Sequence, residues 1–209
     1  MSLKQIAKWN YDRNGLQLDV ELERDMLEEE ATEFRDGLKH YLFESDVNIL
    51  PALKGDYVLD AVVEMVDAYC DYTFVYYGTQ VKLLGSGKIV DVGSTQSIMH
   101  TLLTEILVTH NVTMFEYGEQ PFIDMCMADV IEANMAKPIK KTKGKVTKGK
   151  KWIDPKDKIR QRLLDSGFIA DETLALVGLK EQLHKRVEGD KERQQVVDVA
   201  TLEGDDIED

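Results

Sequence analysis

The first two thirds of the chain carry a helical pattern of apolar and polar positions. Apolar residues recur there every three or four positions, and glycine and proline are sparse. The pattern predicts helices over 22–42, 56–84 and 121–135, and another capped by Ser94 or Ser97. Gly85 and Gly87, typical residues of a helix end, follow the second helix. The fold class that we predict is therefore all-α.

Each of these four helices has an apolar stripe that we expect to face a core. The stripes are Leu27, Ala31, Phe34 and Leu38; Val63, Val66, Cys70, Phe74, Tyr77, Val81 and Leu84; Ile98, Leu102, Ile106 and Leu107; and Phe122, Met125, Cys126 and Val130. Four amphipathic helices joined in this way are typical of a four-helix bundle. The segment 88–93 is the only modest candidate for a strand.

The remainder of the chain differs in composition. Residues 137–151 contain eight lysines and no acidic residue, which indicates a Lys-rich loop. Helical signals return at 156–164 and 171–187, and the residues after Gly189 are rich in Asp and Glu. We predict a main domain over 1–152 that includes the loop, a helical extension over 153–188 and an acidic, disordered tail over 189–209.

The predicted second helix has a stripe of carboxylates beside its apolar stripe. Asp60, Glu64, Asp67 and Asp71 follow one another at spacings of 4, 3 and 4, so they project from one face of the helix. An acidic helix face is often simply solvated. This helix is long and otherwise apolar, however, so we expect it to lie centrally, where carboxylates more often take part in metal or proton chemistry.

A second acidic group precedes it, in the helix over 22–42. Glu30 and Glu33 share a face there, beside Phe34. Acidic residues in a first helical turn can merely complement the helix dipole, but Glu33 lies one turn further along. Because like charges repel and carboxylates are costly to desolvate, the two groups together call for a cation. Mg²⁺ prefers oxygen ligands and often bridges carboxylates and substrate phosphates, which indicates an enzyme with a phosphorylated substrate.

Charge and cysteine content narrow the functional classes. The 209 residues have a net charge of −13, which argues against general binding to nucleic acid or to an anionic membrane. No stretch has the apolar length needed to cross a bilayer, and we expect no membrane association. Two cysteines, Cys70 and Cys126, lie in apolar surroundings, so we expect a reducing compartment and cytoplasmic localisation.

Several segments together resemble the all-α nucleoside triphosphate pyrophosphohydrolases of the MazG and phosphoribosyl-ATP pyrophosphohydrolase superfamily, over about 22–152. Glu30-Ala-Thr-Glu33 is similar to the family's Glu-x-x-Glu motif, and Glu64-Met-Val-Asp67 to its Glu-x-x-Asp motif. The stretch from Asp67 through Asp71 to Thr79 resembles a variant of phage-type members. The segments 132–137 and 144–149 resemble that group's Asn-Met-x-Lys and Gly-Lys-Val-x-Lys-Gly motifs.

This resemblance implies hydrolysis of a nucleoside triphosphate between its α and β phosphates, giving the monophosphate and pyrophosphate. It implies Mg²⁺, with Mn²⁺ as an alternative, held by carboxylates from the set Glu30, Glu33, Glu64, Asp67 and Asp71. If Asp71 takes the final position of the second motif, Ala68 stands where the family has Glu. The ligand paired with Asp71 is then either Glu64 or Asp67.

The same resemblance assigns roles to further residues. One carboxylate, Glu30 or Glu33, would act as the base for the attacking water. Lys137, Lys145 and Lys148 would bind the phosphates, and Asn134 would contact the nucleotide. A homodimer or homotetramer is expected, in the host cytoplasm if the gene is phage-encoded.

Two alternatives remain at this level. The first is a non-catalytic interaction protein that keeps the bundle and binds a partner through its charged loop and tail. The second is a nucleic-acid binder that acts through the lysines of 137–151, for which the net charge is unfavourable.

Overall fold

Helices account for nearly all of the regular structure in the computed structural model, which describes residues 3–14, 16–43, 56–86, 93–112, 121–137, 141–142, 145–146 and 152–170. The helices are α1 (Leu3–Asn14), α2 (Val20–Phe43), α3 (Asp56–Ser86), α4 (Gly93–Thr109), α5 (Phe122–Ala136) and α6 (Lys156–Asp165). Two short strands, β1 (Lys141–Thr142) and β2 (Lys145–Val146), pair antiparallel. The prediction of an all-α fold is confirmed.

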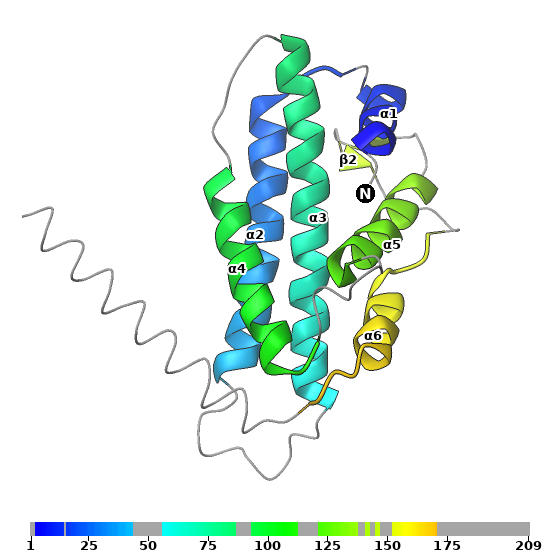
Figure 1. The fold of residues 1–209 in the computed structure, drawn as a ribbon. Helices are drawn as coiled ribbons and strands as arrows, with labels where there is room; N and C mark the ends of the chain where they lie inside the picture. Colours follow the sequence, from blue (N-terminus) through cyan, green and yellow to red (C-terminus); the bar gives the residue numbers. More distant parts are fainter. Residues whose placement is uncertain are drawn as a thin grey trace, which may run out of the picture.

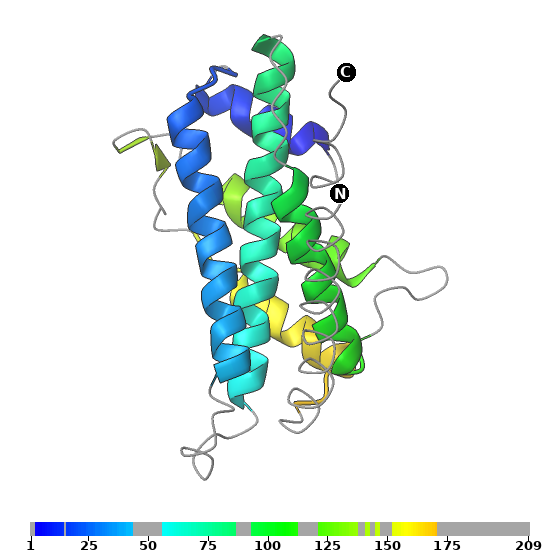
Figure 2. The ribbon, with the colours of Figure 1, turned by 90° about the vertical axis from the view of Figure 1, so that its left-hand side faces the viewer.

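Helix α3 is the centre of the structure. It runs antiparallel to α2, side by side over most of its length, and it also contacts α1, α4, α5 and α6 (Figures 1 and 2). Its residues from Val58 to Phe74 are nearly all buried, as expected for a helix with neighbours on every side. Acidic residues on such a helix are therefore either solvated at a gap between neighbours or held inside the structure.

The other helices each press an apolar stripe against this centre. Helix α2 contributes Leu27 and Phe34, α4 contributes Leu103 and Ile106, and α5 contributes Phe122, Cys126 and Val130. Helix α1 crosses α3 towards the C-terminal end of α3, with Ile6 fully buried (Figure 2). Helix α6 lies below α5, beside the first half of α3 (Figure 1).

Two members of the expected apolar stripes are exposed. Leu84 is 81% exposed because the last turns of α3 extend beyond the end of α2 (Figure 1). Ile98 is 59% exposed because the first half of α4 buries Met99 and Leu103, each one residue after an expected position, while Ile106 and Leu107 are buried as expected. The closed four-helix core stays a prediction.

Several other expectations fall outside the described residues. They are the strand candidate at 88–93 except for Gly93, which begins α4, the helix at 171–187 and the acidic tail at 189–209. Within the described ranges, no helix combines the length and apolar character needed to cross a membrane.

Candidate functional site

The acidic groups of α2 and α3 face each other across the contact between these two helices. Glu30 of α2 lies close enough to Asp71 and Asp67 of α3 for their charges to act on it. Glu33, one turn along α2, is affected in the same way by Asp71 and by Glu64. The structure thus brings together the acidic residues that the sequence places on two separate helices.

The environment at this contact favours the protonated form of three of these carboxyl groups, those of Glu30, Asp67 and Glu33. Burial, followed by the negative charges of Asp71 and Glu33, raises the pKa of Glu30 to about 9. Burial, followed by the charge of Asp71, raises the pKa of Asp67 to about 7. Burial also raises the pKa of the Glu33 carboxyl, in spite of a nearby lysine. A cation placed among these groups would restore their charged forms.

Asp67 is the most enclosed of the group. It is 6% exposed, and its Oδ1 atom is buried without a hydrogen-bond partner among the described residues. Its other oxygen, Oδ2, lies 3.8 Å from Nζ of Lys156. A buried carboxylate oxygen without a donor is costly, and an oxygen-seeking cation is one group that would satisfy it.

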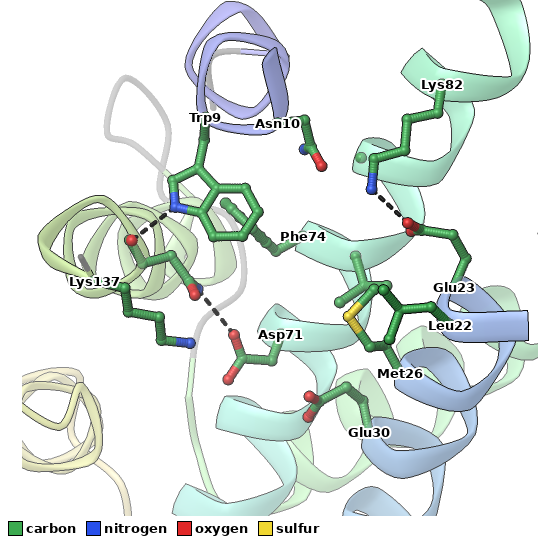
Figure 3. Close-up of a pocket in the computed structure, with 13 residues that line it drawn as sticks. Trp9, Asn10, Leu22, Glu23, Met26, Glu30, Asp71, Phe74, Lys82 and Lys137 are labelled. Atoms are coloured by element: carbon green, nitrogen blue, oxygen red, sulfur yellow. Dashed lines mark hydrogen bonds and ion pairs between the residues drawn. The ribbon is translucent and has the colours of Figure 1, made fainter. Parts of the chain in front are cut away.

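A cleft opens on one side of the acidic group, between α1, α2, α3 and α5 (Figure 3). Its acidic end is lined by Glu30 and Asp71, and Lys137 points its ammonium group towards Asp71. The middle of the cleft is apolar, and its far end is polar. The apolar residues are Leu22, Met26, Phe74 and Val75, and the polar ones are Asn10, Glu23 and Lys82.

Asn134 connects the acidic end of this cleft to α1. Its side-chain amide donates to Oδ1 of Asp71 at 3.1 Å and to the backbone carbonyl of Val130 at 3.1 Å. Trp9 Nε1 in turn donates to the backbone carbonyl of Asn134 at 2.7 Å, and the Trp9 ring meets Phe74 edge to face (Figure 3). Asn134 therefore orients Asp71, and its expected contact with the nucleotide stays a prediction.

Helix α1 reaches the cleft because Gly78 of α3 lets it approach. A Cβ atom at Gly78 would lie 2.7 Å from Nδ2 of Asn10, so only glycine leaves room for this amide. Asn10 is 2% exposed and donates to the backbone carbonyl of Ile6 at 2.9 Å. Neither Trp9 nor Asn10 was among the predicted site residues, since α1 lies before the segment that resembles the enzyme family.

A buried ion pair lies at the far end of the cleft. Lys82 and Glu23 are 2% and 3% exposed, and Nζ of Lys82 lies 2.5 Å from Oε1 of Glu23. Thr79 donates to the other Glu23 oxygen at 2.8 Å. This pair joins α2 to α3, and sequence reasoning missed it because lysine and glutamate are almost never fully buried.

A second cleft lies between α2, α3 and α6. It has a volume of about 440 Å³ and is lined by Glu33, Glu64, Asp60 and Lys156, among others. The predicted metal ligands are thus divided, with Glu30 and Asp71 facing one cleft and Glu33 and Glu64 facing the other. Asp67 lies near both pairs.

Lys156 of α6 is the cation that the structure places in this second cleft. It forms an ion pair and hydrogen bond with Glu64. No predicted site residue came from α6. The described residues include no group of three or more acidic, histidine or cysteine side chains gathered closely enough to hold a metal ion.

The structure says less about two of the predicted phosphate-binding lysines, Lys145 and Lys148. Lys145 lies on β2, at the same end of the bundle as α1 in both ribbon views (Figures 1 and 2). Lys148 lies outside the described residues. Lys137 follows the last turn of α5 directly and lines the first cleft, as its position after the predicted helix suggested.

Comparisons with protein-family models, with curated proteins and with solved structures find no match to this chain.

Proposed function

We propose that the protein is a Mg²⁺-dependent nucleoside triphosphate pyrophosphohydrolase that cleaves between the α and β phosphates. The observation that carries the proposal is the meeting of Glu30 and Glu33 from α2 with Asp67 and Asp71 from α3. Three of these four groups, Glu30, Glu33 and Asp67, have a raised pKa, and gathering them at one helix contact costs stability. Their presence is best explained by a cation that the reaction uses.

The residues fit Mg²⁺ by their chemistry. All of the candidate ligands are carboxylates, and Asp67, whose Oδ1 is buried without a partner among the described residues, interacts by its charge with Glu30, Asp71 and Glu64. When bound, Mg²⁺ would neutralise phosphate charge and lower the pKa of a water molecule. Asn134 would hold Asp71 in position for this role through its amide hydrogen bond.

The lysine at the edge of the first cleft supplies the positive charge for the phosphates. Lys137 is held at the end of α5 because Arg13 of α1 donates to its backbone carbonyl at 2.6 Å. Its ammonium group points towards the acidic end of the cleft (Figure 3). It would stabilise the charge that develops on the pyrophosphate leaving group. Glu30 or Glu33 would take the proton of the attacking water.

The far part of the cleft suits the nucleoside. The cleft has a volume of only about 110 Å³, well below the roughly 300–1,000 Å³ of sites that enclose a whole ligand. It therefore has room for one ring of the nucleotide, and the phosphates would extend out of it beside Glu30 and Asp71. Phe74 and Trp9 offer aromatic surface, and Asn10 offers an amide that can both donate and accept.

A homodimer or homotetramer stays a prediction, which light scattering would test.

The test compares three proteins on a panel of ribo- and deoxyribonucleoside triphosphates with Mg²⁺. The wild type should release monophosphate and pyrophosphate, and Glu33→Gln should lose at least about 100-fold in kcat while keeping its helical circular dichroism. Glu28→Gln is the matched control, because Glu28 is exposed on α2 and pairs only with Arg35 among the described residues. Full activity in Glu33→Gln would remove Glu33 from the site.

A further inference from the structure

Helix α6 is fastened to the bundle by an apolar ridge and two basic stripes. Ile159 and Leu163, four residues apart, are fully buried and form the ridge. Lys156 and Arg160 lie on one side of this ridge and reach Glu64, Asp67 and Asp60 of α3. Lys158 and Arg162, which are also four residues apart, lie on the other side of the ridge.

On that other side, the basic residues reach α5. Arg162 donates from both Nε and a terminal nitrogen to Asp129, the second contact being 3.1 Å, and Asp129 is 6% exposed. Lys158 pairs with Glu132 at 2.7 Å. These contacts are away from the acidic group of α2 and α3, so they can hold the helix when the other side changes.

The stripe on the α3 side ends inside the candidate metal site. Lys156 pairs with Glu64 and lies 3.8 Å from Oδ2 of Asp67, and its charge also acts on Glu33. The three carboxylates are thus arranged around one ammonium group. Yet this arrangement leaves Oδ1 of Asp67, an oxygen that is buried, without a partner among the described residues.

An ammonium group and a divalent cation cannot share this place. Lysine brings one positive charge and three donors on a flexible stem, and it can satisfy these carboxylates only in part. A divalent cation brings twice the charge and requires several oxygen ligands around it. The two cations repel each other, so one has to leave when the other binds.

We infer that Lys156 is a tethered cation that holds Glu64 and Asp67 in the metal-free protein and is exchanged for the divalent ion when the site is loaded. The inference rests on the proposed function for the identity of the ion. On loading, Lys156 withdraws from the second cleft and the first turn of α6 loosens, while Arg162 and the apolar ridge keep the rest of the helix in place. Loading of the site is thereby linked to the state of α6.

The first test is a titration of the protein with Mn²⁺ alone, in which electron paramagnetic resonance measures the concentration of the free ion. Because competition is reciprocal, Lys156→Met should bind Mn²⁺ about tenfold more tightly than the wild type, within the usual range of coupling between sites. Lys158→Met is the matched control, since Lys158 has the same side chain on the same helix and contacts α5 instead. The Lys158→Met variant should bind Mn²⁺ with the affinity of the wild type.

The second test needs no variant. Hydrogen exchange of the wild type with and without Mn²⁺ should show faster exchange in the first turn of α6 when the ion is present, and unchanged exchange around Leu163. Unchanged or weaker Mn²⁺ binding by Lys156→Met, or slower exchange in that first turn, would overturn the inference.

The two proposals fail in different ways. If the wild type hydrolyses triphosphates with Mg²⁺ but Lys156→Met binds Mn²⁺ no more tightly, the exchange is wrong and the activity stands. If none of the proteins binds Mn²⁺, even with a non-hydrolysable triphosphate analogue present, the proposed exchange is wrong. Measuring triphosphate hydrolysis then decides separately whether the proposed activity is wrong too.

Discussion

Replacing Glu30 by glutamine should stabilise the metal-free protein, and the effect should grow with pH. Burial and the charges of its neighbours raise the pKa of Glu30 to about 9 from an ordinary 4.5. The folded protein therefore keeps a proton on Glu30 between these two values, whereas the unfolded chain releases it. Release of the proton favours unfolding, so this group makes stability fall as the pH rises from about 4.5 to 9.

The size of the effect follows from the same pKa. At pH 8 the unfolded state gains about 1.4 kcal/mol for each of about 3.5 pH units, or about 5 kcal/mol, relative to pH below 4.5. Solvent screening at this partly exposed side chain and relaxation of its neighbours reduce the expected gain on substitution to about 2 kcal/mol. For a chain of this size, that gain corresponds to a rise in Tm of about 4 to 8 °C.

The assay is thermal unfolding in a chelator at pH 5 and pH 8. The Tm of Glu30→Gln should be only slightly above that of the wild type at pH 5 and should show the full increase at pH 8. Glu28→Gln, which removes only an exposed ion pair with Arg35, should stay within about 1 kcal/mol of the wild type at both values. A Glu30→Gln protein that is no more stable than the wild type at pH 8 would refute the reasoning that the acidic group is strained without a cation.

Two further predictions concern the attachment of α6 and of α1. Arg162→Leu should lower the free energy of unfolding by about 2 kcal/mol, because it leaves the buried carboxylate of Asp129 without its two-point partner, and chemical denaturation would measure this. Gly78→Ala should cost about 1 to 3 kcal/mol and change the ranking of bases in a hydrolysis panel, because the new methyl group displaces Asn10. Gly85→Ala is its control, since a Cβ atom there meets nothing within 4 Å. Equal effects of the two alanine substitutions would argue against a role of α1 in the cleft.

The parts of this structure that could be predicted from the sequence are those with a local signal. Helical periodicity gave α2 and α3 to within about two residues, because their apolar stripes and the glycines near the end of α3 are read along the chain itself. The same periodicity put Asp67 and Asp71 on one face of α3. That Glu30 would meet them followed only from pairing two such faces.

The remainder depends on contacts that leave little local trace. Lys82 is a single lysine in an apolar stretch, and its burial is made tolerable by Glu23, 59 residues away. Trp9 and Asn10 belong to a short, mostly polar helix with no motif. Lys156 has one signal that could have been used, since the basic residues of α6 fall into two stripes with the same spacing of four on either side of an apolar ridge. That pattern predicts a helix docked on acidic neighbours, although it does not tell which ones.

The central claim is metal-dependent cleavage between the α and β phosphates, and ³¹P nuclear magnetic resonance of the reaction tests it most directly. One nucleoside triphosphate is followed with the wild-type protein, first with Mg²⁺ and then with a chelator in excess. We predict resonances of the monophosphate and of pyrophosphate in equal amounts with Mg²⁺ and no change with the chelator. Diphosphate and inorganic phosphate, or turnover that persists in the chelator, would contradict the account.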